Sequence, residues 1–296
     1  MRKVICCALL IVCLPAQADN SKYYQDWLEF KKEFAAEAAG PTGIYAAQHM
    51  LELNPGESAY LPSGAVDTLR WTKTAPPTPL AQVQFRDRQA LIRGPGIKEH
   101  DLLQPAGESL ALPNGLTVQG TLLRGKTLKL WLYNAKLPAQ KGFEALDYFP
   151  YDASGVITGV FRRNEQPVAT SYLDSREQAG TMYVVGTLQA EVEGKKYDLK
   201  TYSYHNKWNE IDALLLLLRD RTSGKTTYGG GRVVDIHIDK GSPPQEITFD
   251  LNTAYSFLCA HSDYFNCPRV LTNNLDVELK FGEKYPPLFS GNSAKR

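Results

Sequence analysis

The feature that most constrains this chain is a succession of short strand-like segments separated by turn residues, with almost no helical pattern between them. Two pairs flank short turns and predict hairpins: Leu116 to Arg124 with Thr127 to Asn134, and Thr181 to Val192 with Tyr197 to Tyr204. Further strands are predicted at Ala81 to Arg86, Gln89 to Arg93, Val156 to Arg162, Val168 to Leu173, Ala213 to Asp220, Thr226 to Asp239, Glu246 to Asp250 and Leu275 to Phe281. The segment from Ile44 to Leu53 fits either a helix or a strand. The pattern favours a mostly β chain with antiparallel sheets in a sandwich or barrel-like arrangement.

One amphipathic helix is predicted near the N-terminus, from Ser21 to Ala39. Its apolar side chains recur every three or four residues, and Gly40 and Pro41 follow as stop signals. The five leucines from Leu214 to Leu218 lie between charged residues. They are too few to cross a membrane, so we expect a strand that is buried on both faces.

The first 18 residues have the pattern of a secretory signal peptide. Arg2 and Lys3 precede a short apolar run, and an Ala-x-Ala site ends at Ala18. Cleavage there predicts a soluble periplasmic or secreted protein with no integral membrane segment, because the apolar run is shorter than the roughly 20 residues that span a bilayer. The alternative is a lipoprotein acylated at Cys13, but bulky residues precede that cysteine. Loss of Arg2 and Lys3 changes the net charge from +1 to −1, which gives no electrostatic basis for binding nucleic acid.

The cysteines that remain after cleavage, Cys259 and Cys267, are predicted to form a disulfide, since an even number in an exported chain favours pairing. A metal site that includes His261 and Asp263 is the alternative, but cysteine ligands of zinc usually have a shorter spacing. We predict no metal and no cofactor.

The chain is divided by its composition and turn signals into an N-terminal helix (19–40), an N-terminal β region (41–140), a C-terminal β region (141–290) and a disordered tail (291–296). Its content of 43% hydrophobic and 22% charged residues excludes collagen-like, coiled-coil and wholly disordered classes. No repeat or low-complexity run is present. One large β domain or two would fit this length.

Three charged residues, Asp235, His237 and Asp239, alternate along a predicted strand and share one face. They suit a metal site chemically. The intervening apolar residues supply a buried face, so a solvated strand face is the simpler interpretation.

Three glycines, Gly229 to Gly231, interrupt a strand-like segment before Arg232. Glycines in a strand mark a bulge or the close approach of another group, which is a ligand, a strand or an aromatic ring. Arg232 then either recognises an anionic group or pairs with a carboxylate such as Asp220 or Asp250.

A cluster of polar residues near the disulfide suits either a binding or hydrolytic site or a buried hydrogen-bond network. The candidate ligand-binding residues are Tyr228, Arg232, Asp250, Asn252, Tyr255 and Glu283. Asp250 and Glu283 are the candidate carboxylate pair of a metal-independent hydrolase. The serine hydrolase, zincin and penicillin-binding signatures are absent from the sequence.

The same block resembles the bacterial domain-of-unknown-function family 1684. The resemblance is carried by the order of Asp220-x-Thr222-Ser223-Gly224, Thr227 to Arg232, Phe249 to Asn252, Ala254-Tyr255, Cys259-Ala260, Cys267-Pro268, Asn274-Leu275 and Gly282-Glu283. Leu128 to Asn134 and Phe143 to Pro150 resemble it more loosely. Ser256 to Leu258 depart from the family's Asn-Pro-Pro, which leaves the role of that turn open. The resemblance implies an exported or envelope setting and no established activity.

We therefore predict a periplasmic β-rich protein that binds a small-molecule or envelope-derived ligand, acidic or carbohydrate-like, or assists in the cell envelope. The alternatives are the carboxylate-pair hydrolase and a C-terminal motif that only holds the fold together.

Overall fold

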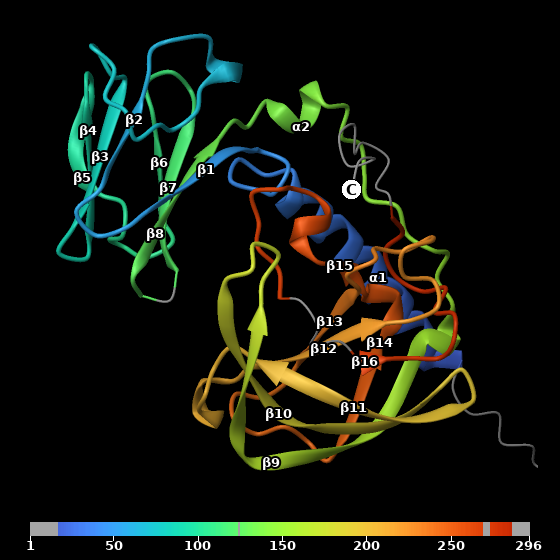
Figure 1. Cartoon of the computed structure of the whole chain (residues 1–296). Helices are drawn as coiled ribbons and strands as arrows, with labels where there is room; N and C mark the ends of the chain where they lie inside the picture. The colour runs from blue at the N-terminus through green and yellow to red at the C-terminus, as the bar shows by residue number, and fades with distance from the viewer. Residues whose placement is uncertain (1–16, 124, 269–272, 286–296) are drawn as a thin grey trace, which may run out of the picture.

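A computed structural model describes residues 17–123, 125–268 and 273–285 (Figure 1). The chain is mostly β with antiparallel sheets and one long helix near the N-terminus, and no sheet in these residues closes into a barrel. This confirms the predicted fold class. The predicted signal peptide, apart from Gln17 and Ala18, and the predicted tail 291–296 lie outside the described residues.

Two four-stranded sheets are formed by residues 47–133. One has the order β1 (Ala47–Leu53), β8 (Thr127–Tyr133), β7 (Thr117–Leu123), β6 (Ser109–Ala111); the other has the order β2 (Ser58–Leu61), β3 (Ala81–Arg86), β4 (Gln89–Gly94), β5 (Ile97–Asp101). The alternating apolar residues of these strands meet in one core cluster that extends from Leu53 to Leu132. The ambiguous segment from Ile44 to Leu53 thus contains a strand.

Three strands in this region were not predicted: β2, β5 and β6. β6 has only three residues and β2 only four. In β5 the single strongly apolar side chain is Ile97, so the segment shows no alternation. Such short or polar edge strands carry little of the periodicity from which strands are recognised.

An eight-stranded sheet occupies the C-terminal half (Figure 1). Its order is β14 (Glu246–Asp250), β9 (Val156–Leu173), β10 (Ala179–Val192), β11 (Lys195–Ser203), β12 (Ala213–Arg219), β13 (Arg232–His237) and β15 (Tyr255–Ser256), and β16 (Asn273–Asn274) pairs with β12 in parallel. The two strands predicted between Val156 and Leu173 are one long strand, β9. Its register with β10 shifts where the two predicted strands join, since Val184 pairs with Val168 and Gly186 with Arg163.

Two strand predictions in this half are corrected. The segment predicted from Thr226 to Asp239 is a strand only from Arg232 to His237, because the glycines before it form a turn. The segment from Leu275 to Phe281 is not a strand and bends at Asp276 and Val277. Its alternation is real, since Leu275, Val277, Leu279 and Phe281 are all buried.

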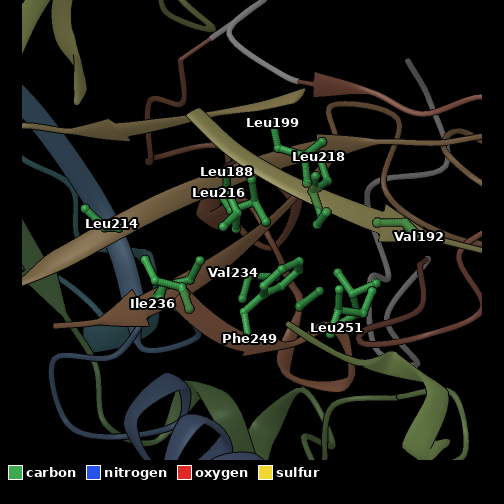
Figure 2. Close-up of a cluster of buried hydrophobic side chains, with 14 of the residues drawn as sticks. Leu188, Val192, Leu199, Leu214, Leu216, Leu218, Val234, Ile236, Phe249 and Leu251 are labelled. Atoms are coloured by element: carbon green, nitrogen blue, oxygen red, sulfur yellow. The ribbon is translucent and has the colours of Figure 1, made fainter. Parts of the chain in front are cut away.

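The core of the C-terminal half lies on one face of the large sheet (Figure 2). Leu214, Leu216 and Leu218 of β12 point into this core, whereas Leu215 and Leu217 belong to a second apolar cluster. The prediction of a strand buried on both faces is confirmed.

The N-terminal helix α1 (Gln17–Ala38) packs through its aromatic side chains, as its periodicity predicts. Trp27 lies 5.5 Å from the ring of Tyr151, and Phe34 lies 5.0 Å from the ring of Tyr255, measured between centroids. A short helix α2 (Leu137–Gln140) connects β8 with the segment that leads to β9. Among the described helices, none combines the length and apolar character needed to cross a membrane.

Candidate functional site

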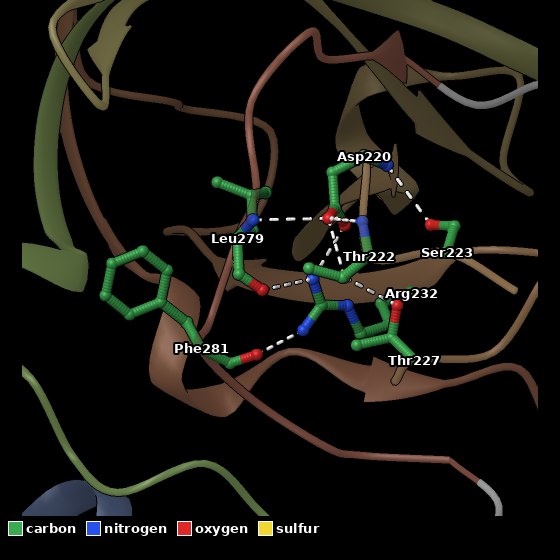
Figure 3. A network of polar contacts seen from close by, with 7 residues as sticks. All are labelled: Asp220, Thr222, Ser223, Thr227, Arg232, Leu279 and Phe281. Carbon is green, nitrogen blue, oxygen red and sulfur yellow. Dashed lines mark hydrogen bonds and ion pairs between the residues drawn. The ribbon is translucent and has the colours of Figure 1, made fainter. Parts of the chain in front are cut away.

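Arg232, the first residue of β13, forms a buried ion pair with Asp220 at the end of β12 (Figure 3). Their side chains are 2% and 0% exposed, and Nη2 of Arg232 lies 2.8 Å from Oδ2 of Asp220. Of the two alternatives for Arg232, pairing with a carboxylate inside the fold is therefore the one that the structure shows.

The same ion pair satisfies the backbone of the C-terminal segment (Figure 3). Arg232 donates through Nη2 to the carbonyl of Leu279 at 3.0 Å and through Nη1 to the carbonyl of Phe281. Asp220 accepts through Oδ1 from the backbone amides of Thr222 at 2.8 Å and Leu279 at 3.2 Å. Because buried backbone groups require partners, this pair replaces part of the strand ladder that the segment lacks.

The three glycines form the turn that leads into β13. A Cβ atom on Gly230 would lie 2.4 Å from Cε1 of Tyr228, so the Tyr228 ring occupies the space beside this glycine. Gly231 has a φ of +104°, a conformation that favours glycine. The glycine run thus accommodates an aromatic ring and a turn, and the Tyr228 hydroxyl lies 3.6 Å from Sγ of Cys259.

Asp250 and Asn252 connect the short 3₁₀ helix η4 (Leu251–Thr253) with the segment before β9. Oδ1 of Asp250 accepts from the backbone amide of Asn252 at 2.8 Å and from its side-chain amide at 2.7 Å. Asn252 also exchanges hydrogen bonds with the backbone of Asp152. Burial raises the pKa of Asp250, while the bonds from Asn252 oppose that shift. Asp250 therefore acts as the N-cap of η4.

Glu283 is fully buried at the centre of a second polar network. Its Oε2 accepts from the backbone amide of Ser256 at 2.7 Å, and its Oε1 lies 3.1 Å from Nε2 of His261. Nδ1 of His261 is 2.7 Å from the Tyr45 hydroxyl. Burial and the charge of Glu283 raise the pKa values of Tyr45 and Tyr148. The network joins the segment before β1 to β15 and to the disulfide loop.

The carboxylate-pair hydrolase gains no support from this geometry. Glu283 offers no exposed atom to a substrate, and Oδ1 of Asp250 is held by Asn252. A general acid or base has to reach the proton that it transfers.

The predicted disulfide between Cys259 and Cys267 closes a loop that contacts the N-terminal sheets. Phe265 in this loop lies 4.7 Å from the ring of Trp131 on β8, measured between centroids, and Tyr264 packs in the same apolar cluster. The loop also binds the β9–β10 turn, through the Asp263 carbonyl to Arg176 at 2.9 Å. The disulfide loop therefore holds β8 and the β9–β10 turn together.

Removal of the disulfide is expected to lower the free energy of unfolding by about 2–3 kcal/mol, because the open loop gains entropy when the chain unfolds. Urea unfolding of the protein with and without reductant measures this loss. The variant Cys259→Ser/Cys267→Ser is the control, since reductant should change its midpoint no further. An unchanged midpoint for the reduced protein would contradict the assignment.

Among the candidate residues, Tyr255 is half-buried and contacts an exposed side chain. Its hydroxyl donates to Oδ2 of Asp235 on β13 at 2.9 Å, and Asp235 is exposed. His237 is exposed on the same strand face, whereas Val234 and Ile236 are buried. This is the solvated strand face that the alternation predicts, except that β13 ends before Asp239. No cluster of three or more metal-ligating side chains occurs in the described part of the chain.

Two further tyrosines lie close to Asp235, because Tyr204 interacts electrostatically with both Asp235 and Tyr172. Tyr204 follows β11, and Tyr172 is half-buried near the end of β9, with its ring beside Gly180. Tyr204 is 58% exposed. We call Tyr172, Tyr204, Asp235 and Tyr255 the tyrosine surface. Tyr204 and Tyr172 were not among the predicted site residues, because their proximity to Asp235 depends on how the strands between β9 and β13 align.

The comparisons with known proteins place the C-terminal motif in the family that the sequence resembles. Residues 141–284 match the model of a family described as "Protein of unknown function (DUF1684)". A solution NMR structure of an uncharacterized protein from Haloarcula marismortui is 30% identical and covers 49% of this chain and 78% of that chain, with a TM-score of 0.41. No curated protein matches the chain. Through residues 141–284, which contain the large sheet, the Arg232–Asp220 ion pair and Glu283, the chain belongs to the DUF1684 family.

Proposed function

We propose that this protein is an exported, periplasmic or secreted, binding protein of the cell envelope, and that its tyrosine surface binds a carbohydrate-like ligand. The observation that carries the proposal is the exposed Asp235 carboxylate, held by the Tyr255 hydroxyl beside the exposed ring of Tyr204. Export is supported by the signal-peptide pattern that ends at Ala18.

The chemistry of this surface suits a ligand rich in hydroxyl groups. Sugar rings have apolar C–H faces that pack on aromatic rings, and a tyrosine offers an apolar body with a polar tip. A carboxylate accepts hydrogen bonds from hydroxyl groups through either oxygen. The hydrogen bond from Tyr255 fixes one oxygen of Asp235 and so orients the carboxylate before a ligand binds.

An acidic ligand is not proposed at this surface. Arg232, the residue on which that possibility depended, is buried and paired with Asp220. Asp235 would repel an anion at this site.

Replacement of Tyr204 by alanine is expected to weaken binding of a neutral oligosaccharide about tenfold, since an aromatic contact contributes roughly 0.5–1.5 kcal/mol beyond its buried area. Isothermal titration calorimetry on ligands selected from a glycan array measures the change. The matched control is Tyr24→Ala, which removes a 40% exposed tyrosine that packs against Trp27 and Tyr151 instead. No glycan binding, or equal weakening in both variants, would contradict the proposal.

A further inference from the structure

The charge of Asp235 is not neutralised by a basic partner. Its Oδ2 accepts from the Tyr255 hydroxyl, and within the described ranges no lysine or arginine forms an ion pair with it. His237 is the nearby group that favours the charged form of Asp235, and its side chain is exposed on the same strand.

The groups that interact with Asp235 are the phenols of Tyr255 and Tyr204 and the imidazole of His237. Tyr255 interacts electrostatically with Asp235, Tyr204 and Glu37, and burial is the main cause that raises its pKa. Tyr204 interacts with Tyr172 and Asp235. The surface therefore combines the exposed ring of Tyr204 with a carboxylate that no lysine or arginine of the described residues neutralises.

We propose that the tyrosine surface binds the protonated amino group of an amine-bearing saccharide, with Asp235 as its counter-ion and the exposed ring of Tyr204 against its sugar. This inference rests on the proposed function and names the ligand class more narrowly. The amine supplies the positive charge that the surface lacks, so the choice of occupant follows from charge complementarity.

Two interactions favour a cation at this place. An ammonium group near a carboxylate gains Coulomb energy, and one over a tyrosine face gains a cation–π interaction. Asp235 is exposed and forms an ion pair with no lysine or arginine of the described chain. A bound cation would supply that partner, whereas a neutral sugar would not.

The test compares two saccharides of equal length on the full chain: a glucosamine tetramer, at a pH at which its amines are protonated, and the neutral N-acetylglucosamine tetramer. Choline serves as a cation without a sugar. We expect the glucosamine tetramer to bind about tenfold more tightly than the neutral one, which is the effect of a partly desolvated cationic contact. Asp235→Asn should reduce this preference to less than about twofold while the thermal unfolding midpoint stays unchanged, because the exposed side chain keeps its bond to Tyr255.

The matched control is Asp198→Asn. Asp198 is also exposed and also accepts one side-chain hydrogen bond, from Gln189 on the neighbouring strand. This variant should keep the full preference for the amine.

The remaining outcomes separate the two proposals. Equal or tighter binding of the neutral tetramer, with loss in Tyr204→Ala, would overturn the inference and leave the proposed function standing. Binding of choline but of neither saccharide would overturn both saccharide claims, as would the absence of binding by all three probes. A preference for the amine that persists in Asp235→Asn would overturn the role of Asp235.

Discussion

Replacement of Arg232 by alanine is expected to lower the free energy of unfolding by about 3–5 kcal/mol, because it leaves the Asp220 carboxylate buried without its counter-charge. The carbonyls of Leu279 and Phe281 lose their donors in the same step. Urea unfolding followed by circular dichroism measures the loss. Arg232→Lys should rescue little of it, since one ammonium group cannot reproduce the planar fork that reaches a carboxylate and two carbonyls.

The control for this prediction is Arg221→Ala, which removes an exposed arginine next to Asp220 in the chain. Arg221 also pairs with an aspartate, Asp276, at 2.6 Å, but both side chains are more than half exposed. Its removal should leave the free energy of unfolding nearly unchanged, because solvent screens an exposed ion pair. Equal small losses in Arg221→Ala and Arg232→Ala would show that Arg232 is not structural.

Replacement of Glu283 by alanine is expected to lower the free energy of unfolding by about 3 kcal/mol. The buried amide of Ser256 and the ring of His261 would both lose their partner, and each unpaired buried group carries a desolvation penalty. Glu283→Gln keeps an acceptor for Ser256 and should retain part of the stability. The same unfolding experiment measures both variants.

Glu278→Ala is the matched control for the second prediction, since Glu278 lies five residues earlier on the same segment but is exposed and paired with Lys280. It should be nearly neutral. If Glu283→Ala were as mild as Glu278→Ala, the polar network around His261 would contribute nothing to the fold.

Much of the sheet structure follows from local periodicity. The segments from Ala81 to Arg86 and from Glu246 to Asp250 were predicted with their observed bounds, because their apolar residues alternate clearly. Leu275 to Phe281 alternates as well but is not a strand. Leu275 and Val277 bond to the backbone of Arg219 and Arg221, but from Leu279 on the partners are the side chains of Asp220 and Arg232. Sequence periodicity does not distinguish such side-chain partners from a neighbouring strand.

The candidate site was predictable in its chemistry but not in its exposure. Arg232, Asn252 and Glu283 are polar residues that suit a ligand as well as a buried network, and their burial depends on distant segments that cover them. His261 stood alone in the sequence, and its partners Tyr45 and Glu283 lie far from it along the chain. Local sequence contains no signal for such long-range pairs.

The central claim is that the buried carboxylates of the family motif hold the fold together and do not bind ligands. Native-state hydrogen exchange of three backbone amides tests it most directly. Each of these amides donates a hydrogen bond to a buried or half-buried carboxylate: Leu279 to Asp220, Ser256 to Glu283, and Asn252 to Asp250. We expect exchange as slow as that of the core of β12, through unfolding of the C-terminal half. Exchange near the rate of an unstructured chain would mean that these carboxylates open to solvent, and would contradict the account.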